Sequence, residues 1–115
     1  MAYHIFMGVG SPGNEADFNI YLGSAITLHE YWESVGYKLG LPIISEITEN
    51  ADSEDGLVLS GVDLESFRNE MVIFEKYWID KSSTESLPDR LLLNIKKIIQ
   101  QSDYAYSLGL DLMIA

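Results

Sequence analysis

The sequence predicts an α+β fold: a single layered domain, residues 1–115, with about four or five short, mostly antiparallel strands and three helices. A length of 115 residues is common for one domain, and a hydrophobic fraction of 47% is sufficient for one packed core. Segments in which polar and apolar residues alternate predict strands, and apolar residues that recur every three or four positions predict helices. Both patterns occur in this chain, separated by turn residues.

The first two strands are expected near the start of the sequence. Residues 3–9 are rich in aromatic and branched side chains, which is typical of a strand. Residues 10–14 are Gly, Ser, Pro, Gly and Asn, which predict a turn or loop. Phe18, Ile20 and Leu22 then alternate with mostly polar positions. We expect them to face the core from a second strand that forms a hairpin with the first.

A helix is expected over residues 25–39. Ser24 is its predicted N-cap, and Gly40 followed by Pro42 predicts its end. Gly36 weakens the helical pattern. The predicted core face consists of Leu28, Trp32, Val35 and Leu39.

The next segments predict a second hairpin. A short strand is expected near residues 43–48, followed by an acidic loop over residues 49–56. Residues 57–59 are expected to return as the hairpin partner of that strand. Residues 110–114 also alternate and predict a final strand.

The second helix is expected to begin after Ser60. Ser60 and Asp63 have the spacing of a capping box, and Leu59 and Leu64 have that of a hydrophobic staple. Its predicted core face repeats at heptad spacing and consists of Leu64, Phe67, Met71, Phe74 and Trp78.

The third helix is expected to begin near Ser86, because Pro88 is tolerated in a first turn. Gly109 is the predicted residue just past its end. Its predicted core face consists of Leu91, Ile95, Ile98 and Ile99.

The charge of the chain is strongly negative and unevenly distributed. The net charge is −11. Residues 1–67 contain eleven acidic residues and one basic residue, Lys38, whereas residues 68–115 contain seven acidic and six basic residues. Residues 39–67 contain no Lys or Arg. Such a surface repels nucleic acid and anionic lipid and attracts a basic partner, although acidity that serves only solubility is the alternative.

Two motifs suggest ligands but lack the context that each needs. The glycines at positions 8, 10 and 13 have dinucleotide-binding spacing, yet the residues after them alternate as in a strand, so we favour a turn. His29 and Glu33 stand four residues apart, as two metal ligands on a helix could. A third ligand is not evident, so we favour a solvated helix face.

The segment 50–56 has the alternating oxygen side chains of a calcium loop. An EF-hand needs Gly at its sixth position and Glu at its twelfth, and here these are Asp55 and Gly61. We therefore favour an acidic hairpin loop. No serine has a nucleophile-elbow motif and no pair of carboxylates is singled out, so we expect a binding protein rather than an enzyme.

Several classes of protein are excluded or disfavoured by composition. The chain has no cysteine, so it has no disulfide and no Cys-based zinc site. It has no apolar run of about 18 residues, and its first residues lack a basic n-region, so we expect neither a membrane span nor a signal peptide. We expect a cytoplasmic protein with no cofactor and no metal.

The predicted partner-binding residues fall into two groups. The first is the acidic stretch with Glu46, Glu49, Asp52, Glu54 and Asp55. The second is where the third helix loses its apolar period, and it consists of Asp103, Tyr104 and Tyr106. Tyr is favoured at interfaces, although ordinary packing is the alternative.

Residues 56–71, GLVLSGVDLESFRNEM, resemble a strand–cap–helix segment of small bacterial immunity proteins. These are the antidotes encoded beside polymorphic toxins, including those of contact-dependent inhibition. The resemblance covers this segment alone. It implies a small acidic protein that binds and neutralises a cognate, basic, nuclease-type toxin domain.

The alternatives are another polyanion mimic, such as a phage anti-restriction or anti-CRISPR protein, a small enzyme with a dispersed carboxylate site, and a subunit of a larger assembly. The sequence leaves the oligomeric state open.

Overall fold

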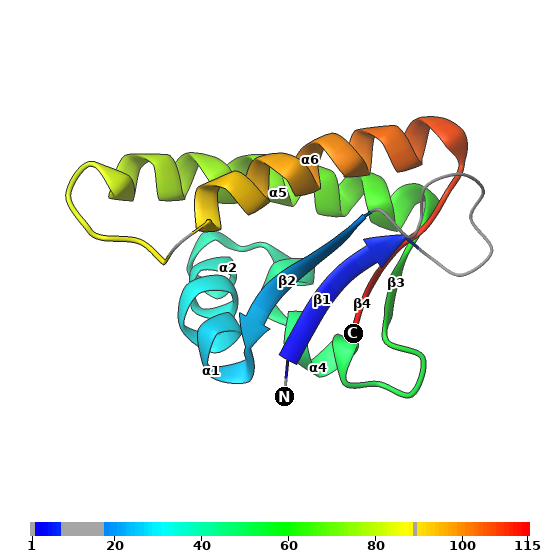
Figure 1. Cartoon of the computed structure of the whole chain (residues 1–115), viewed down its shortest axis with the longest axis horizontal. Coiled ribbons are helices and arrows are strands. Elements are labelled where there is room, and N and C mark those ends of the chain that lie inside the picture. Colours follow the sequence, from blue (N-terminus) through cyan, green and yellow to red (C-terminus); the bar gives the residue numbers. More distant parts are fainter. Residues whose placement is uncertain (1, 8–17, 89) are drawn as a thin grey trace.

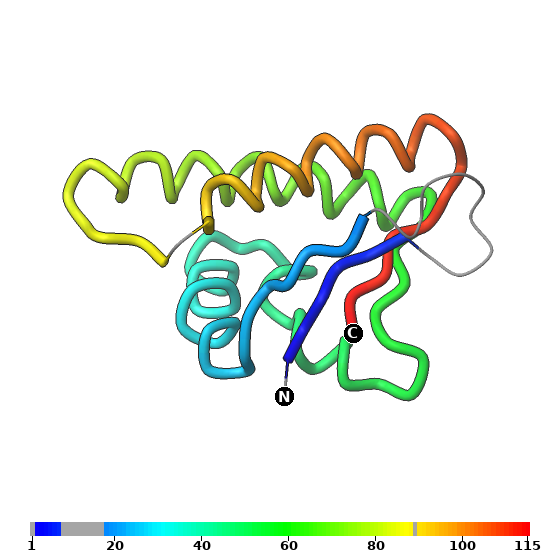
Figure 2. Tube along the Cα trace, viewed as in Figure 1, coloured from blue at the N-terminus to red at the C-terminus, as the bar shows by residue number. Residues whose placement is uncertain are grey.

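The computed structural model describes residues 2–7, 18–88 and 90–115 (Figure 1). Within these residues the strands form one sheet in the order β2-β1-β4-β3, with every neighbouring pair antiparallel. Two long helices, α5 (Gly61–Ser82) and α6 (Leu91–Leu108), run side by side along one side of the molecule (Figure 2). The sheet and the shorter helices lie on the other side. The predicted α+β class is confirmed, with more helices than the three expected.

The predicted N-terminal hairpin is confirmed. Strand β1 (Ala2–Met7) pairs with β2 (Asn19–Ser24), with His4 opposite Tyr21 and Tyr3 opposite Gly23. Leu22 therefore has no partner, so it forms a bulge and lies buried in the core. Phe18 and Ile20 are half-buried against the core. The predicted loop and the glycine motif, at residues 8–14, lie outside the described residues.

The helix predicted over residues 25–39 is one continuous helical segment made of α1 (Ala25–Leu28), a π-helical turn η1 (His29–Glu33) and α2 (Ser34–Leu39). As predicted, Ser24 caps it, with its Oγ accepting the N–H of Thr27 at 3.3 Å. Gly40 ends it with φ +71°. The π-helical turn was not predicted. The predicted core residues Leu28, Trp32 and Val35 are buried, and Leu39 packs partly buried against them.

The strand predicted near residues 43–48 is wrong. This segment forms two short helices, α3 (Pro42–Ser45) and α4 (Ile47–Ala51). Pro42 begins α3, and the carboxylate of Glu70, on α5, accepts the N–H groups of Ile43 and Ile44. A carboxylate at a helix N-terminus satisfies donors that have no partner within the helix. The helical conformation is thus stabilised by a residue distant in sequence.

The hairpin predicted for residues 57–59 is also wrong, because there is no strand at 43–48 to pair with. Strand β3 (Leu57–Leu59) pairs instead with β4 (Leu112–Ile114), with Leu57 opposite Ile114 and Leu59 opposite Leu112. The predicted C-terminal strand is therefore confirmed, and it lies between β1 and β3. Strand β3 is an edge of the sheet.

Helix α5 confirms the predicted core stripe, since Leu64, Phe67, Met71, Phe74 and Trp78 are all buried. The capping box is not formed. Ser60 makes no side-chain cap bond, and its carbonyl oxygen accepts the N–H of Asp63 at 3.1 Å instead.

Helix α6 begins five residues later than predicted. Arg90 precedes it in a left-handed conformation with φ +66°, which is incompatible with continuing the helix backwards through Pro88 to Ser86. Leu91, Ile95 and Ile98 are buried and Ile99 is half-buried, as predicted, and Gly109 ends the helix with φ +68°. The buried face continues through Ser102 and Ala105 past Tyr104, so the apolar period does not end where we expected.

Candidate functional site

The five acidic residues of the first predicted group are all exposed. Glu46 lies between α3 and α4, and Glu49 lies on α4. Asp52, Glu54 and Asp55 lie in the connection that joins α4 to β3. With no basic residue in the segment 39–67, these carboxylates have no cation nearby in sequence.

Local hydrogen bonds hold the α4–β3 connection in a tight turn. The hydroxyl of Ser53 donates to the carbonyl oxygen of Asn50 at 2.7 Å and to that of Gly56 at 3.0 Å. The N–H of Gly56 donates back to the carbonyl oxygen of Ser53, and Gly56 has φ +73°, which favours glycine. The acidic side chains are therefore presented on a turn whose own bonds define its conformation.

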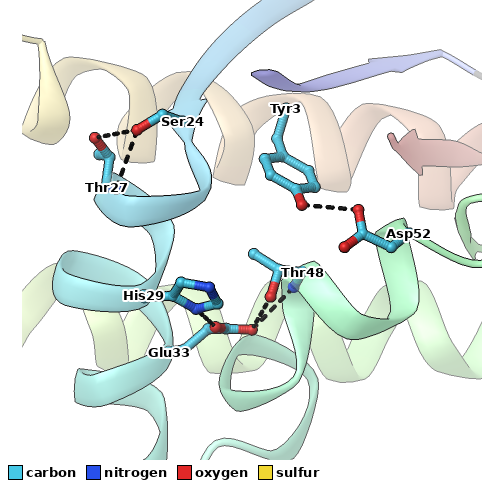
Figure 3. Close-up of polar contacts among 7 residues, drawn as sticks. All are labelled: Tyr3, Ser24, Thr27, His29, Glu33, Thr48 and Asp52. Carbon is cyan, nitrogen blue, oxygen red and sulfur yellow. Dashed lines mark hydrogen bonds and ion pairs between the residues drawn. The ribbon is translucent and has the colours of Figure 1, made fainter. Parts of the chain in front are cut away.

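Asp52 differs from the other acidic residues of the turn because it contributes to the fold. Its carboxylate accepts a hydrogen bond from the hydroxyl of Tyr3 at 2.7 Å (Figure 3). Tyr3 is buried on β1, and the pKa of its hydroxyl is raised, first by this hydrogen bond and then by burial and the nearby negative charge. The bond joins the turn to the sheet across 49 residues of sequence.

Glu33 is not part of a solvated helix face, contrary to our expectation. Its side chain is only 15% exposed, and one carboxylate oxygen accepts both the N–H of Thr48 at 2.9 Å and its hydroxyl at 2.7 Å (Figure 3). The other oxygen bonds to the ring of His29. Glu33 thus caps the N-terminal turn of α4 and fixes the helix that carries Glu49.

The second predicted group lies on the last turns of α6. Asp103 accepts a hydrogen bond from the guanidinium Nε of Arg68, on α5, at 2.9 Å. The carboxylate of Glu65 and its negative charge raise the pKa of the Tyr106 hydroxyl. These four side chains and Asn69 line a hollow of about 260 Å³ between the two helices.

Tyr104 is 46% exposed and does not line this hollow. Tyr104 and the hollow lie near the end of β3 at Leu59, and the acidic turn lies near the end at Leu57. The register establishes this arrangement, because Leu59 pairs with Leu112 just after α6 ends, whereas Leu57 directly follows the turn. The two predicted groups are therefore not in contact but are joined by the edge strand β3 (Figure 1).

Two exposed valines near β3 were not predicted as site residues. Val58 is 41% exposed on β3, and Val62 is 78% exposed in the first turn of α5. Apolar side chains surrounded by charge are typical of the centre of a protein interface. The sequence predicted residues 57–59 as the hairpin partner of a strand at 43–48, which gave no specific reason to expect Val58 at an exposed edge. We use the name acidic edge for the exposed surface around β3 made of Glu49, Glu54, Asp55, Val58, Val62 and Glu65.

Metal-binding and membrane-spanning features are not found in the part of the chain that the structure describes. No three His, Cys, Asp or Glu side chains in residues 2–7, 18–88 and 90–115 form a group that could hold a metal ion. No helix in those ranges combines the length and apolar character needed to cross a bilayer. The fold and the site thus define an α+β domain with an acidic sheet edge. No model of a known protein family matches the chain, and neither does any curated protein or solved structure.

Proposed function

We propose that the protein is an immunity protein that binds a basic, nuclease-type toxin domain in the cytoplasm and blocks its active site or its access to substrate. The observation that carries the proposal is the acidic edge. It combines exposed carboxylates, two exposed valines and a strand edge with no partner among the described residues, in a segment without any Lys or Arg. A basic protein is the partner that such a surface attracts.

The two kinds of residue would contribute to different steps of binding. Exposed carboxylates accelerate association with a basic surface, but each exposed ion pair adds only about 0–1 kcal/mol and is screened by salt. An antidote needs at least nanomolar affinity, or about −12 kcal/mol. A desolvated centre must therefore supply most of the binding energy. Val58 and Val62, with the half-exposed ring of Tyr106 at the α6 end, are the side chains available for it.

A charge-reversal variant tests the acidic edge. Glu49→Lys, Glu54→Lys and Asp55→Lys should together slow association with the toxin at low salt by roughly a hundredfold, since steered and unsteered association rates differ by two to three powers of ten. Asp52 is kept, because its bond to Tyr3 contributes to the fold. Stopped-flow fluorescence measures the rate, and circular dichroism verifies that the variant is folded.

The control reverses three exposed acids on other parts of the molecule: Glu30 in η1, Asp80 on α5 and Glu85 after α5. Both triple variants change the net charge by the same amount, so the comparison separates local complementarity from overall attraction. We expect the control to bind the toxin several-fold faster than the acidic-edge variant. Equal rates for the two variants contradict a binding role for the acidic edge.

The antidote function itself is tested in cells. The protein is co-expressed with the toxin encoded beside its gene, and growth and co-purification are measured. Protected growth together with a co-purifying complex supports the proposal. Cells that die as fast with the protein as without it refute it, and a polyanion-mimic inhibitor then becomes the leading function.

A further inference from the structure

The sheet edge opposite β3 carries a groove of different character. A cavity of about 370 Å³ lies along β2, and its lining includes all five consecutive residues 19–23 of that strand. Successive strand residues point to opposite faces of a sheet, so a cavity over one face would be lined by alternate residues only. Contact with five residues in succession indicates that the cavity follows the edge of β2.

A second cavity extends this space. It has a volume of about 230 Å³ and shares Asn19, Ile20 and Lys97 with the first. It continues past them to Phe18 and Gln101. The two cavities together follow residues 19–23 of β2, and we call them the β2 groove. Its length favours an extended ligand over a compact one.

No strand in residues 2–7, 18–88 and 90–115 pairs with the side of β2 that faces the groove. The strand order places β2 at the end of the sheet, with β1 as its neighbour. Backbone N–H and C=O groups on a free strand edge are a template for another strand, and extended peptides bind many proteins in this way. The five residues of β2 along the groove span roughly 16 Å, at about 3.3 Å per residue.

The opposite wall of the β2 groove is basic. Arg90, Asn94 and Lys97 line it, and their spacing of four and three residues places them on one face of the start of α6. Neither Arg90 nor Lys97 forms an ion pair with any described residue. None of the described residues that line either cavity is acidic, although the chain has a net charge of −11. The charged side chains in the described lining are thus basic, which favours anions.

The backbone at the mouth of the groove is strained. Arg90 has φ +66°, and no other non-glycine residue in the described part of the chain has a positive φ. Such a conformation costs about 1–3 kcal/mol and is concentrated at functional sites. Tyr31, which is half-buried, and Trp32, which is almost fully buried, also line the first cavity. The groove thus offers both apolar and charged contacts.

We propose that the β2 groove binds an extended acidic peptide segment of a partner protein, which pairs with β2 as an additional strand while its carboxylates contact Arg90 and Lys97. The site is independent of the acidic edge, since β2 and β3 are opposite edges of the sheet. Charge complementarity determines the occupant: the acidic edge attracts basic surfaces and the β2 groove attracts acidic ones.

The test uses the full chain, labelled with ¹⁵N, and an acetylated hexapeptide in which Glu and Val alternate. Nuclear magnetic resonance follows the backbone amides while the peptide is added up to about 1 mM, a concentration at which even weak complexes are half formed. We expect shifts that saturate along residues 19–23 and 90–97. We also expect contacts between the Hα protons of the peptide and those of β2. Unchanged amides in both ranges overturn the proposal.

Two further probes separate strand pairing from simple anion binding. The same hexapeptide with every residue N-methylated keeps its charge but loses its N–H donors, so it should bind at least about tenfold more weakly. Inorganic phosphate alone should produce little change at residues 19–23. If the N-methylated peptide or phosphate binds as well as the hexapeptide, the site takes small anions and the proposal is wrong.

Adjacent lysines provide a matched pair of variants. Lys97 lines both cavities, whereas Lys96 is exposed and lines neither. Lys97→Glu should weaken binding of the hexapeptide by roughly tenfold or more, because it removes an attractive charge and adds a repulsive one. Lys96→Glu changes the net charge equally and should have a much smaller effect. Equal losses in the two variants overturn the proposed contact.

Discussion

Replacing Glu70 should lower the stability of the protein much more than replacing an exposed residue of the same helix, because its buried carboxylate bonds to another helix. Glu70 is 7% exposed, and its carboxylate accepts the N–H of Ile43 at 3.0 and 3.2 Å and that of Ile44 at 3.0 Å. These bonds join the middle of α5 to the first turn of α3. The carboxylate therefore stabilises the two short helices in the segment where the sequence predicts a strand.

The expected loss of stability depends on the backbone N–H groups that would be left without an acceptor. Each buried N–H group that loses its partner costs about 1–3 kcal/mol, and Ile43 is only half-buried, so water can reach its N–H in part. We expect Glu70→Ala to lower the free energy of unfolding by about 2–4 kcal/mol. Glu70→Gln retains one oxygen, Oε1, that lies within bonding distance of both donors, so it should cost about 1 kcal/mol. Asp80→Ala, at an exposed position on the same helix, is the control and should change stability by less than about 0.5 kcal/mol.

The pH dependence gives a second, independent measurement. Burial raises the pKa of Glu70, although the hydrogen bonds from Ile44 and Ile43 act in the opposite direction. The folded protein therefore holds this proton to higher pH than the unfolded chain does. The raised pKa therefore adds to the free energy of unfolding at low pH. This stabilisation is fully present below the ordinary carboxyl pKa and is lost as the pH rises through the raised pKa of Glu70. Glutamine does not titrate, so Glu70→Gln should remove the part of the pH dependence of the free energy of unfolding that comes from Glu70.

Urea denaturation followed by circular dichroism, at several pH values from acidic to neutral, measures both effects. The reasoning fails if Glu70→Ala is as stable as the Asp80→Ala control. It also fails if Glu70→Gln keeps the full pH slope of the unmodified protein.

Three other substitutions test specific contacts by the same unfolding measurement. Tyr3→Phe should lower the free energy of unfolding by about 1 kcal/mol, because it removes the bond to Asp52. In a protein that already carries Asp52→Ala, Tyr3→Phe should cost little, so losses that simply add in the double variant contradict the bond. Arg90→Gly should stabilise the protein by up to about 1 kcal/mol, because glycine adopts φ +66° without strain, and a lower melting temperature argues against the strain. Gly36→Ala should destabilise by about 1–3 kcal/mol, because its Cβ would lie 2.8 Å from the backbone nitrogen of Ser45; a variant as stable as the original shows that α3 can move away.

The parts of the fold that were predictable depend on local pattern. The buried stripe of α5, from Leu64 to Trp78, could be identified because an amphipathic helix carries its core face in its own sequence. The segment 43–48 could not, because its branched residues favour a strand while Glu33 and Glu70, far away in sequence, satisfy the donors of two helices. Tertiary bonds override local preference there.

The same distinction applies to the sites. Exposure of Glu54 and Asp55 could be expected from a polar turn, but the bond of Asp52 to Tyr3 joins residues on separate elements and left no local signal. The β2 groove was missed for the same reason. It exists because residues 19–23 meet residues 90–97 in space, and neither stretch is unusual in isolation.

The order of the strands has a consequence for how the protein folds during its synthesis. Strand β4, at residues 112–114, lies between β1 and β3, so the two sides of the sheet are joined only through it in the described fold. The ribosome makes β4 after every other strand. Until it emerges, the β1–β2 hairpin and β3 have no shared hydrogen bonds, and the apolar residues of both are without their central neighbour. Contacts this distant in sequence slow folding, so the four-stranded sheet is expected to form only after β4 has been made, with the β1–β2 hairpin and β3 docking onto it late.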